Sequence, residues 1–187
     1  MNLHDEIRQE LFIHFEKCVK KHFDFLNDMS YSVKKDTVGW IVHYASEKVT
    51  VNVCYGRISD EIDLTLNLEK QNIPIYIEEI IKGNDKRNYF CAVNADVVDK
   101  SVAELAKLLK KYGEKFLSGD VNVFESVLNT REKSVKKYDL KLIEQKAVDA
   151  WNDVNYAEVV ALYQSIKENL TPIQEKRLNL SLKKTNE

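Results

Sequence analysis

Four side chains that could bind a metal ion recur every four residues near the start of the chain: Glu10, His14, Cys18 and His22. Residues spaced by four lie on one face of a helix, and histidine and cysteine are good ligands for zinc or copper. Four ligands on one straight helix cannot all surround a single ion. The preferred interpretation is therefore that no metal is bound. His14 and Cys18 are the candidate ligands in the alternative case of a metal site.

Acidic residues form a second group at Asp60, Glu61 and Asp63, beside a segment with strand periodicity. Alternation along a strand would place Glu61 and Asp63 together on its polar face. Two such carboxylates could hold magnesium in a nuclease or phosphatase, or present a negative surface to a basic partner. The simplest interpretation, preferred to either function, is a solvated strand face that discourages edge pairing. Of the two functional alternatives, the partner surface is favoured over the metal site.

Basic residues form the third group, with Lys133, Lys137 and Lys141 spaced four apart in a helical pattern. A helical stripe of lysines can contact the phosphates of a nucleic acid. Acidic residues, including Glu132 and Asp139, are interleaved with these lysines, which is typical of an ordinary salt-bridged helix surface. Nucleic-acid binding through the lysine stripe therefore stays an alternative to the preferred interpretation.

Several common catalytic motifs are missing from the sequence. The five glycines are isolated, so the chain has neither a phosphate-binding loop nor a dinucleotide fingerprint. It also lacks the GxSxG, HExxH and CxxC patterns of serine hydrolases, zinc proteases and zinc ribbons. No cofactor is expected.

Composition limits the classes of partner further. The 187 residues have a formal net charge of −2 with both signs interspersed, which argues against a protein held to nucleic acid by bulk charge. Three cysteines cannot close into a disulfide framework, which favours a reducing compartment. The N-terminus does not resemble a signal peptide, and no apolar run has the roughly 20 residues that span a bilayer. The sequence predicts a cytoplasmic protein without a membrane partner.

The periodicity of apolar residues changes along the first half of the chain. A 3.6-residue period between Leu3 and Leu26 predicts an amphipathic helix. A two-residue period then predicts four strands near residues 31–33, 40–44, 49–55 and 62–68. A turn centred on Ser46 and Glu47 would pair Val42 with Val51. These strands would form an antiparallel meander with one apolar and one polar face.

The second half of the chain is mainly helical in pattern. A short helix is expected over 75–81, residues 89–98 are left undecided between strand and loop, and helices follow from Ser101. Separate helices are expected after Asp120, over 135–151 and over 156–169, and the last begins at the capping sequence that starts with Thr171. We therefore predict an α+β fold, with an N-terminal helix packed on a four-stranded antiparallel meander and an all-helical C-terminal half. The expected domains are 1–132 and a helical hairpin or extension at 133–187.

Two resemblances add to this interpretation. The small and aromatic residues around Ala150, Trp151 and Tyr163 make the C-terminal hairpin similar to a single tetratricopeptide-type unit. The order of features over most of the chain resembles a group of bacterial cytosolic α+β proteins, some of which are toxin-immunity proteins. This second resemblance rests on the aromatic-rich first helix, the strand at 61–66 and the segment from Leu109 to Asp120.

That second resemblance implies a protein that binds and neutralises another protein. The preferred function is thus a non-enzymatic protein-binding module of the immunity type, whose partner is another protein such as a toxin. Asp60, Glu61 and Asp63 are the expected contact residues. A metal-dependent nuclease or phosphatase and a nucleic-acid-binding protein are the alternatives, and the oligomeric state is left open.

Overall fold

The structure, a computed structural model, describes residues 3–34, 40–56, 59–69, 71, 73–82, 87 and 91–185, with the backbone alone for residues 3–8. The fold class is α+β, as predicted, with one antiparallel sheet and a largely helical remainder. The chain forms two compact units, Met1–Leu128 and Asn129–Glu187.

The sheet of the first unit is an antiparallel meander in the order β1-β2-β3-β4-β5. Its strands are β1 (Ser32–Lys34), β2 (Ile41–Ala45), β3 (Val49–Tyr55), β4 (Ile62–Leu68) and β5 (Ile75–Tyr76). The prediction of four strands was thus one strand short, and the expected helix over 75–81 is reduced to α3 (Ile77–Ile80). Ile75 pairs with Leu66 and is fully buried whereas Tyr76 is exposed, so the two-residue period continues past Pro74.

The register of β2 and β3 differs from the prediction by two residues. Val42 lies opposite Val53, not Val51. The turn is centred one residue later than expected because Ser46 closes it: its backbone N–H donates to the Val49 carbonyl at 2.9 Å, and its hydroxyl accepts from the Val49 N–H at 3.1 Å. A shift of two residues keeps every side chain on the same face, so the predicted apolar face is still the buried one.

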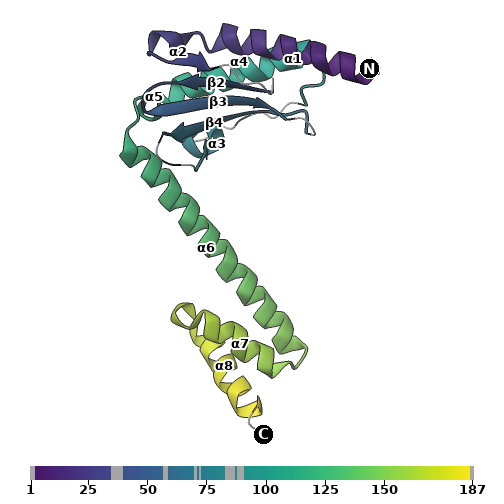
Figure 1. The fold of residues 1–187 in the computed structure, drawn as a ribbon. Coiled ribbons are helices and arrows are strands. Elements are labelled where there is room, and N and C mark those ends of the chain that lie inside the picture. Colours follow the sequence, from purple (N-terminus) through teal and green to yellow (C-terminus); the bar gives the residue numbers. More distant parts are fainter. Residues whose placement is uncertain are drawn as a thin grey trace. The chain divides into compact units, whose positions relative to one another are not determined.

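Two long helices, α1 (Leu3–His22) and α4 (Ala95–Tyr112), pack against each other and cover one face of the sheet (Figure 1). The short helices α2 (Phe25–Asp28) and α5 (Glu114–Leu117) follow them in the chain. The predicted first helix is therefore interrupted after His22. The helix predicted from Ser101 begins six residues earlier, at Ala95. Asn94 caps this helix, because its side chain accepts a hydrogen bond from the Val97 N–H at 3.0 Å. Cys91, Ala92 and Val93 belong to no helix or strand.

Helices build the second unit. The long helix α6 (Val121–Asn152) begins in the first unit and continues into the second, where α7 (Tyr156–Ser165), a 3₁₀ turn (Lys167–Asn169) and α8 (Pro172–Thr185) follow. The predicted break between two helices near residue 135 was wrong, since no glycine or proline interrupts α6. The capping box at Thr171 is confirmed by its reciprocal hydrogen bonds with Gln174. The core of this unit consists of Ala147, Ala150, Val159, Tyr163, Ile166 and Leu178.

None of the helices in the described part of the chain is both long and apolar enough to cross a bilayer.

Ile73 and Ile75 give a matched test of the fifth strand. Ile75→Ala should lower the free energy of unfolding by about 2–5 kcal/mol, because it creates a cavity in the buried core. Ile73→Ala, at a side chain that is 49% exposed, should change it by less than about 0.5 kcal/mol. Urea unfolding measures both. Equal effects of the two substitutions would contradict the burial of β5.

Candidate functional site

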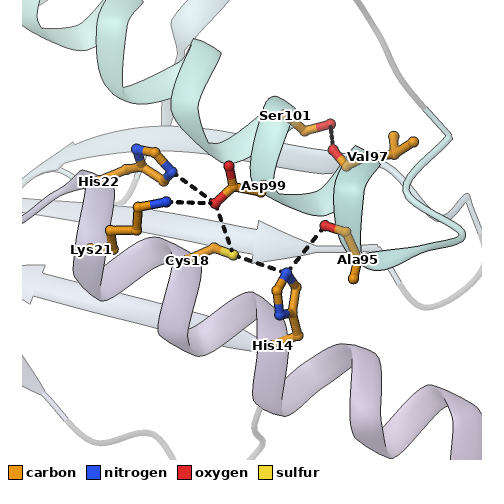
Figure 2. Close-up of polar contacts among 8 residues, drawn as sticks. All are labelled: His14, Cys18, Lys21, His22, Ala95, Val97, Asp99 and Ser101. Carbon is orange, nitrogen blue, oxygen red and sulfur yellow. Dashed lines mark hydrogen bonds and ion pairs between the residues drawn. The ribbon is translucent and has the colours of Figure 1, made fainter.

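A carboxylate that receives three hydrogen bonds links the two long helices of the first unit. Asp99 on α4 accepts at Oδ1 from Nε2 of His22 at 3.0 Å, from Nζ of Lys21 at 3.2 Å and from Sγ of Cys18 at 3.4 Å. All three donors lie near the end of α1 and converge on one oxygen (Figure 2). The interhelical contact is therefore polar at this point, although most of the interface is apolar.

His14 extends the cluster along α1. Its Nε2 lies 3.1 Å from the backbone oxygen of Ala95 and 3.3 Å from Sγ of Cys18 (Figure 2). The simplest arrangement has the His14 N–H donating to Ala95 and the Cys18 thiol donating to Asp99. The cluster thus ties the second half of α1 to the first turns of α4.

The environment of the cluster sets its protonation states. Hydrogen bonding from His22 lowers the pKa of Asp99 from 3.8 to about 2, and the bonds from Lys21 and Cys18 act in the same direction. Burial, together with the neighbouring Asp99, raises the pKa of the Cys18 thiol to about 11. At neutral pH Asp99 is therefore an anion, and Cys18 is a protonated thiol rather than a nucleophile.

The predicted helical constellation lies partly in this cluster. His14, Cys18 and His22 lie along one side of α1, whereas Glu10 is exposed. The sequence could not reveal Asp99, which lies 77 residues beyond His22. Among the residues that the structure describes, no group of three or more His, Cys, Asp and Glu side chains is arranged to hold a metal ion, so the cluster is best described as a hydrogen-bond network.

The polar face of the sheet is preorganised by cross-strand hydrogen bonds. Nδ1 of His43 on β2 lies 2.6 Å from Oδ1 of Asn52 on β3, whose amide donates to the Thr65 hydroxyl on β4 at 3.3 Å. These three residues lie opposite one another in the register and are all half-buried. They form one row across three strands on the face that α1 and α4 do not cover.

The predicted acidic residues lie at one end of this sheet and are half-buried. Asp63 is in β4, opposite Cys54, and Asp60 and Glu61 precede that strand. Asp60 has a φ of 51°, a left-handed conformation that aspartate tolerates better than most residues. Its backbone oxygen accepts a hydrogen bond from the Ala92 N–H at 2.6 Å, which fastens the turn to the segment before α4.

An arginine that the sequence did not single out neutralises part of the acidic group. The Arg87 guanidinium bonds to Asp63 at 2.6 Å, and also to Glu78 and to the Ile62 carbonyl. Its side chain is only 5% exposed, whereas that of Asp63 is 42% exposed. Burial lowers the pKa of Arg87, but the hydrogen bonds from Arg87 to Glu78 and Asp63 outweigh it, so the pKa is raised overall and the group stays charged.

The predicted lysine stripe lies on α6. Lys133, Lys137 and Lys141 are all exposed. Their neighbour Lys136 forms an ion pair with Glu132 at 2.7 Å, which is the interleaved surface pairing that the sequence suggested.

Comparison of this chain with known proteins found no matching protein family, curated protein or solved structure.

The Asp99 network generates a prediction for stability in acid. The free energy contributed by its carboxylate is complete above pH 3.8, the ordinary pKa, and is lost as the pH falls toward 2. Asp99→Asn should lower the free energy of unfolding at pH 7 by about 1 kcal/mol, a modest amount because the side chain is partly exposed. It should also flatten the pH dependence between 4 and 2.

Urea unfolding across that pH range measures the effect, with Glu125→Gln at an exposed position of the same unit as the control. An unchanged acid slope in Asp99→Asn would contradict the lowered pKa.

The thiols generate a second prediction. Cys91 is exposed, whereas Cys18 is buried and burial also raises the pKa of Cys54 to about 11. At pH 8 iodoacetamide should therefore alkylate Cys91 at least about 100-fold faster than Cys18 or Cys54, because the thiolate is the reactive form. Peptide mass mapping over time measures the three rates. In urea the rates should converge, and comparable native rates would show that the Cys18 thiol is not held as described.

Proposed function

We propose that this chain is a protein-binding module that acts without catalysis, as an immunity-type inhibitor of a basic protein toxin. The observation that carries the proposal is the open face of the sheet, where polar side chains are held in place by hydrogen bonds and carboxylates lie at one end. A surface whose side chains are already fixed loses little conformational entropy when a partner docks.

The row formed by His43, Asn52 and Thr65 supplies the fixed part of this surface. Because each side chain is anchored to its cross-strand neighbour, its polar atoms are held in a defined direction. Half-buried polar groups of this kind provide specificity at an interface, whereas they add little affinity by area alone.

Charge at the end of the sheet supplies the attraction. Arg87 offsets one of the two carboxylates that it binds, Asp63 and Glu78, and Glu61 adds a further negative charge before the same strand. A local excess of negative charge speeds encounter with a basic partner, and the effect weakens as salt is added. Glu61 is therefore the residue whose charge should matter most, because Asp63 is already paired.

The engagement of Asp63 also argues against the nuclease or phosphatase alternative. A divalent ion needs carboxylate oxygens that face it, and the Arg87 guanidinium bonds the Asp63 oxygen directly. Protonated thiols at Cys18 and Cys54 likewise lend no support to nucleophilic catalysis.

The immunity-type assignment draws on the resemblance in the order of features to a group of bacterial cytosolic α+β proteins, some of which are immunity proteins. Three free cysteines fit the reducing cytoplasm in which such an inhibitor would meet its toxin.

The test begins with a partner captured by cross-linking in the cells that make this protein. With that partner purified, Glu61→Lys should weaken binding at low salt by at least about tenfold and reduce the salt dependence. Calorimetric or optical titration at two salt concentrations measures both. Glu47→Lys is the matched control, because Glu47 is exposed at the opposite end of β3 and should change the affinity less than about twofold.

If Glu61→Lys leaves the affinity and its salt dependence unchanged, the acidic end is not the contact surface. The inhibitory role has its own readout: expression of the partner alone should slow growth, and co-expression of this chain should restore it. If expression of the captured partner does not slow growth, the immunity role is excluded and only the role of a protein-binding module remains.

A further inference from the structure

One row of side chains crosses all five strands on the open face of the sheet. In β5, Tyr76 lies opposite Thr65. In β1, Lys34 lies opposite His43. Residues directly opposite each other in antiparallel strands point to the same face, so the row of His43, Asn52 and Thr65 continues to both edges of the sheet. With strands about 4.8 Å apart, the whole row is roughly 19 Å long.

Tyr76 is an aromatic residue at one end of this row, and it is 46% exposed. Its neighbour Ile75 is fully buried opposite Leu66, so the alternation of β5 directs Tyr76 to the open face. The backbone is held at this point, because the Tyr76 N–H donates to a Glu79 carboxylate oxygen at 2.9 Å at the start of α3. Tyrosine is one of the residue types that most often anchor protein interfaces.

Two carboxylates neighbour Tyr76, one across the strands and one along the chain. Asp63 is two residues before Thr65 on the same face of β4, which makes it a diagonal neighbour of Tyr76. Glu78 follows Tyr76 by two residues, and Arg87 bonds both Glu78 and Asp63. Because Arg87 carries one positive charge against these two negative ones, the three side chains together keep a net negative charge.

An aromatic ring beside carboxylates suits an arginine side chain. The planar guanidinium stacks on an aromatic face and pairs with carboxylates, whereas a lysine ammonium is a compact and more strongly hydrated charge. The other end of the row has the opposite character, because Lys34 is exposed there and repels a cation. A basic segment that lies along the row is therefore attracted to the Tyr76 end.

We propose that the open face of the sheet binds an arginine side chain of the partner over the Tyr76 ring, with Asp63 and Glu78 supplying the opposite charge. Tyr76 is then the residue that selects arginine over lysine in the partner. This inference rests on the proposed function, because the arginine belongs to the basic partner proposed there. It adds which side chain that partner presents and where on the sheet the side chain lies.

An acetylated hexa-arginine peptide is the probe for the first test, and hexa-lysine is the comparison of equal charge. The full chain should bind hexa-arginine at least about threefold more tightly, because the guanidinium stacks better on the ring. Tyr76→Ala should weaken hexa-arginine binding about fivefold, whereas Tyr76→Phe, which keeps the ring, should stay within about twofold of wild type. Calorimetric titration measures the affinities, and NMR chemical shifts of the wild-type protein should change mainly at Tyr76, Thr65 and Asp63.

Tyr138→Ala is the matched control, because Tyr138 is a tyrosine of α6 that is 67% exposed. It should bind both peptides within about twofold of the wild-type affinity. Equal affinities for the two peptides, or equal losses in Tyr76→Ala and Tyr138→Ala, would overturn the proposal by showing attraction between bulk charges alone. Circular dichroism checks that the variants are folded, and the comparison of the two peptides on the wild-type protein decides the matter if one is not.

The captured partner separates the failure of this inference from the failure of the proposed function. If Glu61→Lys weakens binding of the partner but Tyr76→Ala changes it less than about twofold, the acidic contact surface stands and the arginine site is refuted. If hexa-arginine binding depends on Tyr76 but Glu61→Lys leaves the affinity for the partner unchanged, the arginine site stands and the acidic contact surface is refuted. Losses of affinity for the partner in both variants support both.

Discussion

Valine and leucine side chains on one face of β3 and β4 are removed from water by α1 and α4, and this burial restricts where every polar group of the first unit can lie. Val51, Val53, Leu64 and Leu66 are fully buried, and each contributes roughly 1.5–3 kcal/mol of transfer free energy. A slip of one residue in either strand would turn these side chains toward water and the polar set toward the core. The register is thereby fixed, and with it the row of His43, Asn52 and Thr65 on the opposite face.

The same burial produces two sides of different character. The helical layer carries the Asp99 network, whereas the end of the sheet carries Asp60, Glu61 and the carboxylates that Arg87 binds.

Polar contacts in this unit connect residues that are far apart in the chain. His22 meets Asp99, Arg87 meets Asp63, and the Tyr31 hydroxyl donates to the Leu117 carbonyl at 2.8 Å. Each contact closes a long loop of chain and satisfies a group that would otherwise be costly to bury. The apolar packing brings these polar groups together, and their hydrogen bonds then fix the relative positions of the segments that carry them.

Periodicity alone was enough for the α+β class, the first four strands and the buried face of β2, β3 and β4, because alternation of side chains is a local property of the backbone. It was wrong for β1, whose three residues are all exposed. Two further features had a local signal in the sequence: Asn94 caps the start of α4, and the Ser46 side chain closes the turn between β2 and β3. Other residues nearby could also have capped the helix or centred the turn, so the sequence did not distinguish these positions. Only the tertiary structure decided which distant residues meet. The contact of Asp99 with His22 and the contact of Arg87 with Asp63 depend on how helices and strands pack in space. Spacing along the chain does not record that packing, and so these charged contacts could not be predicted from the sequence.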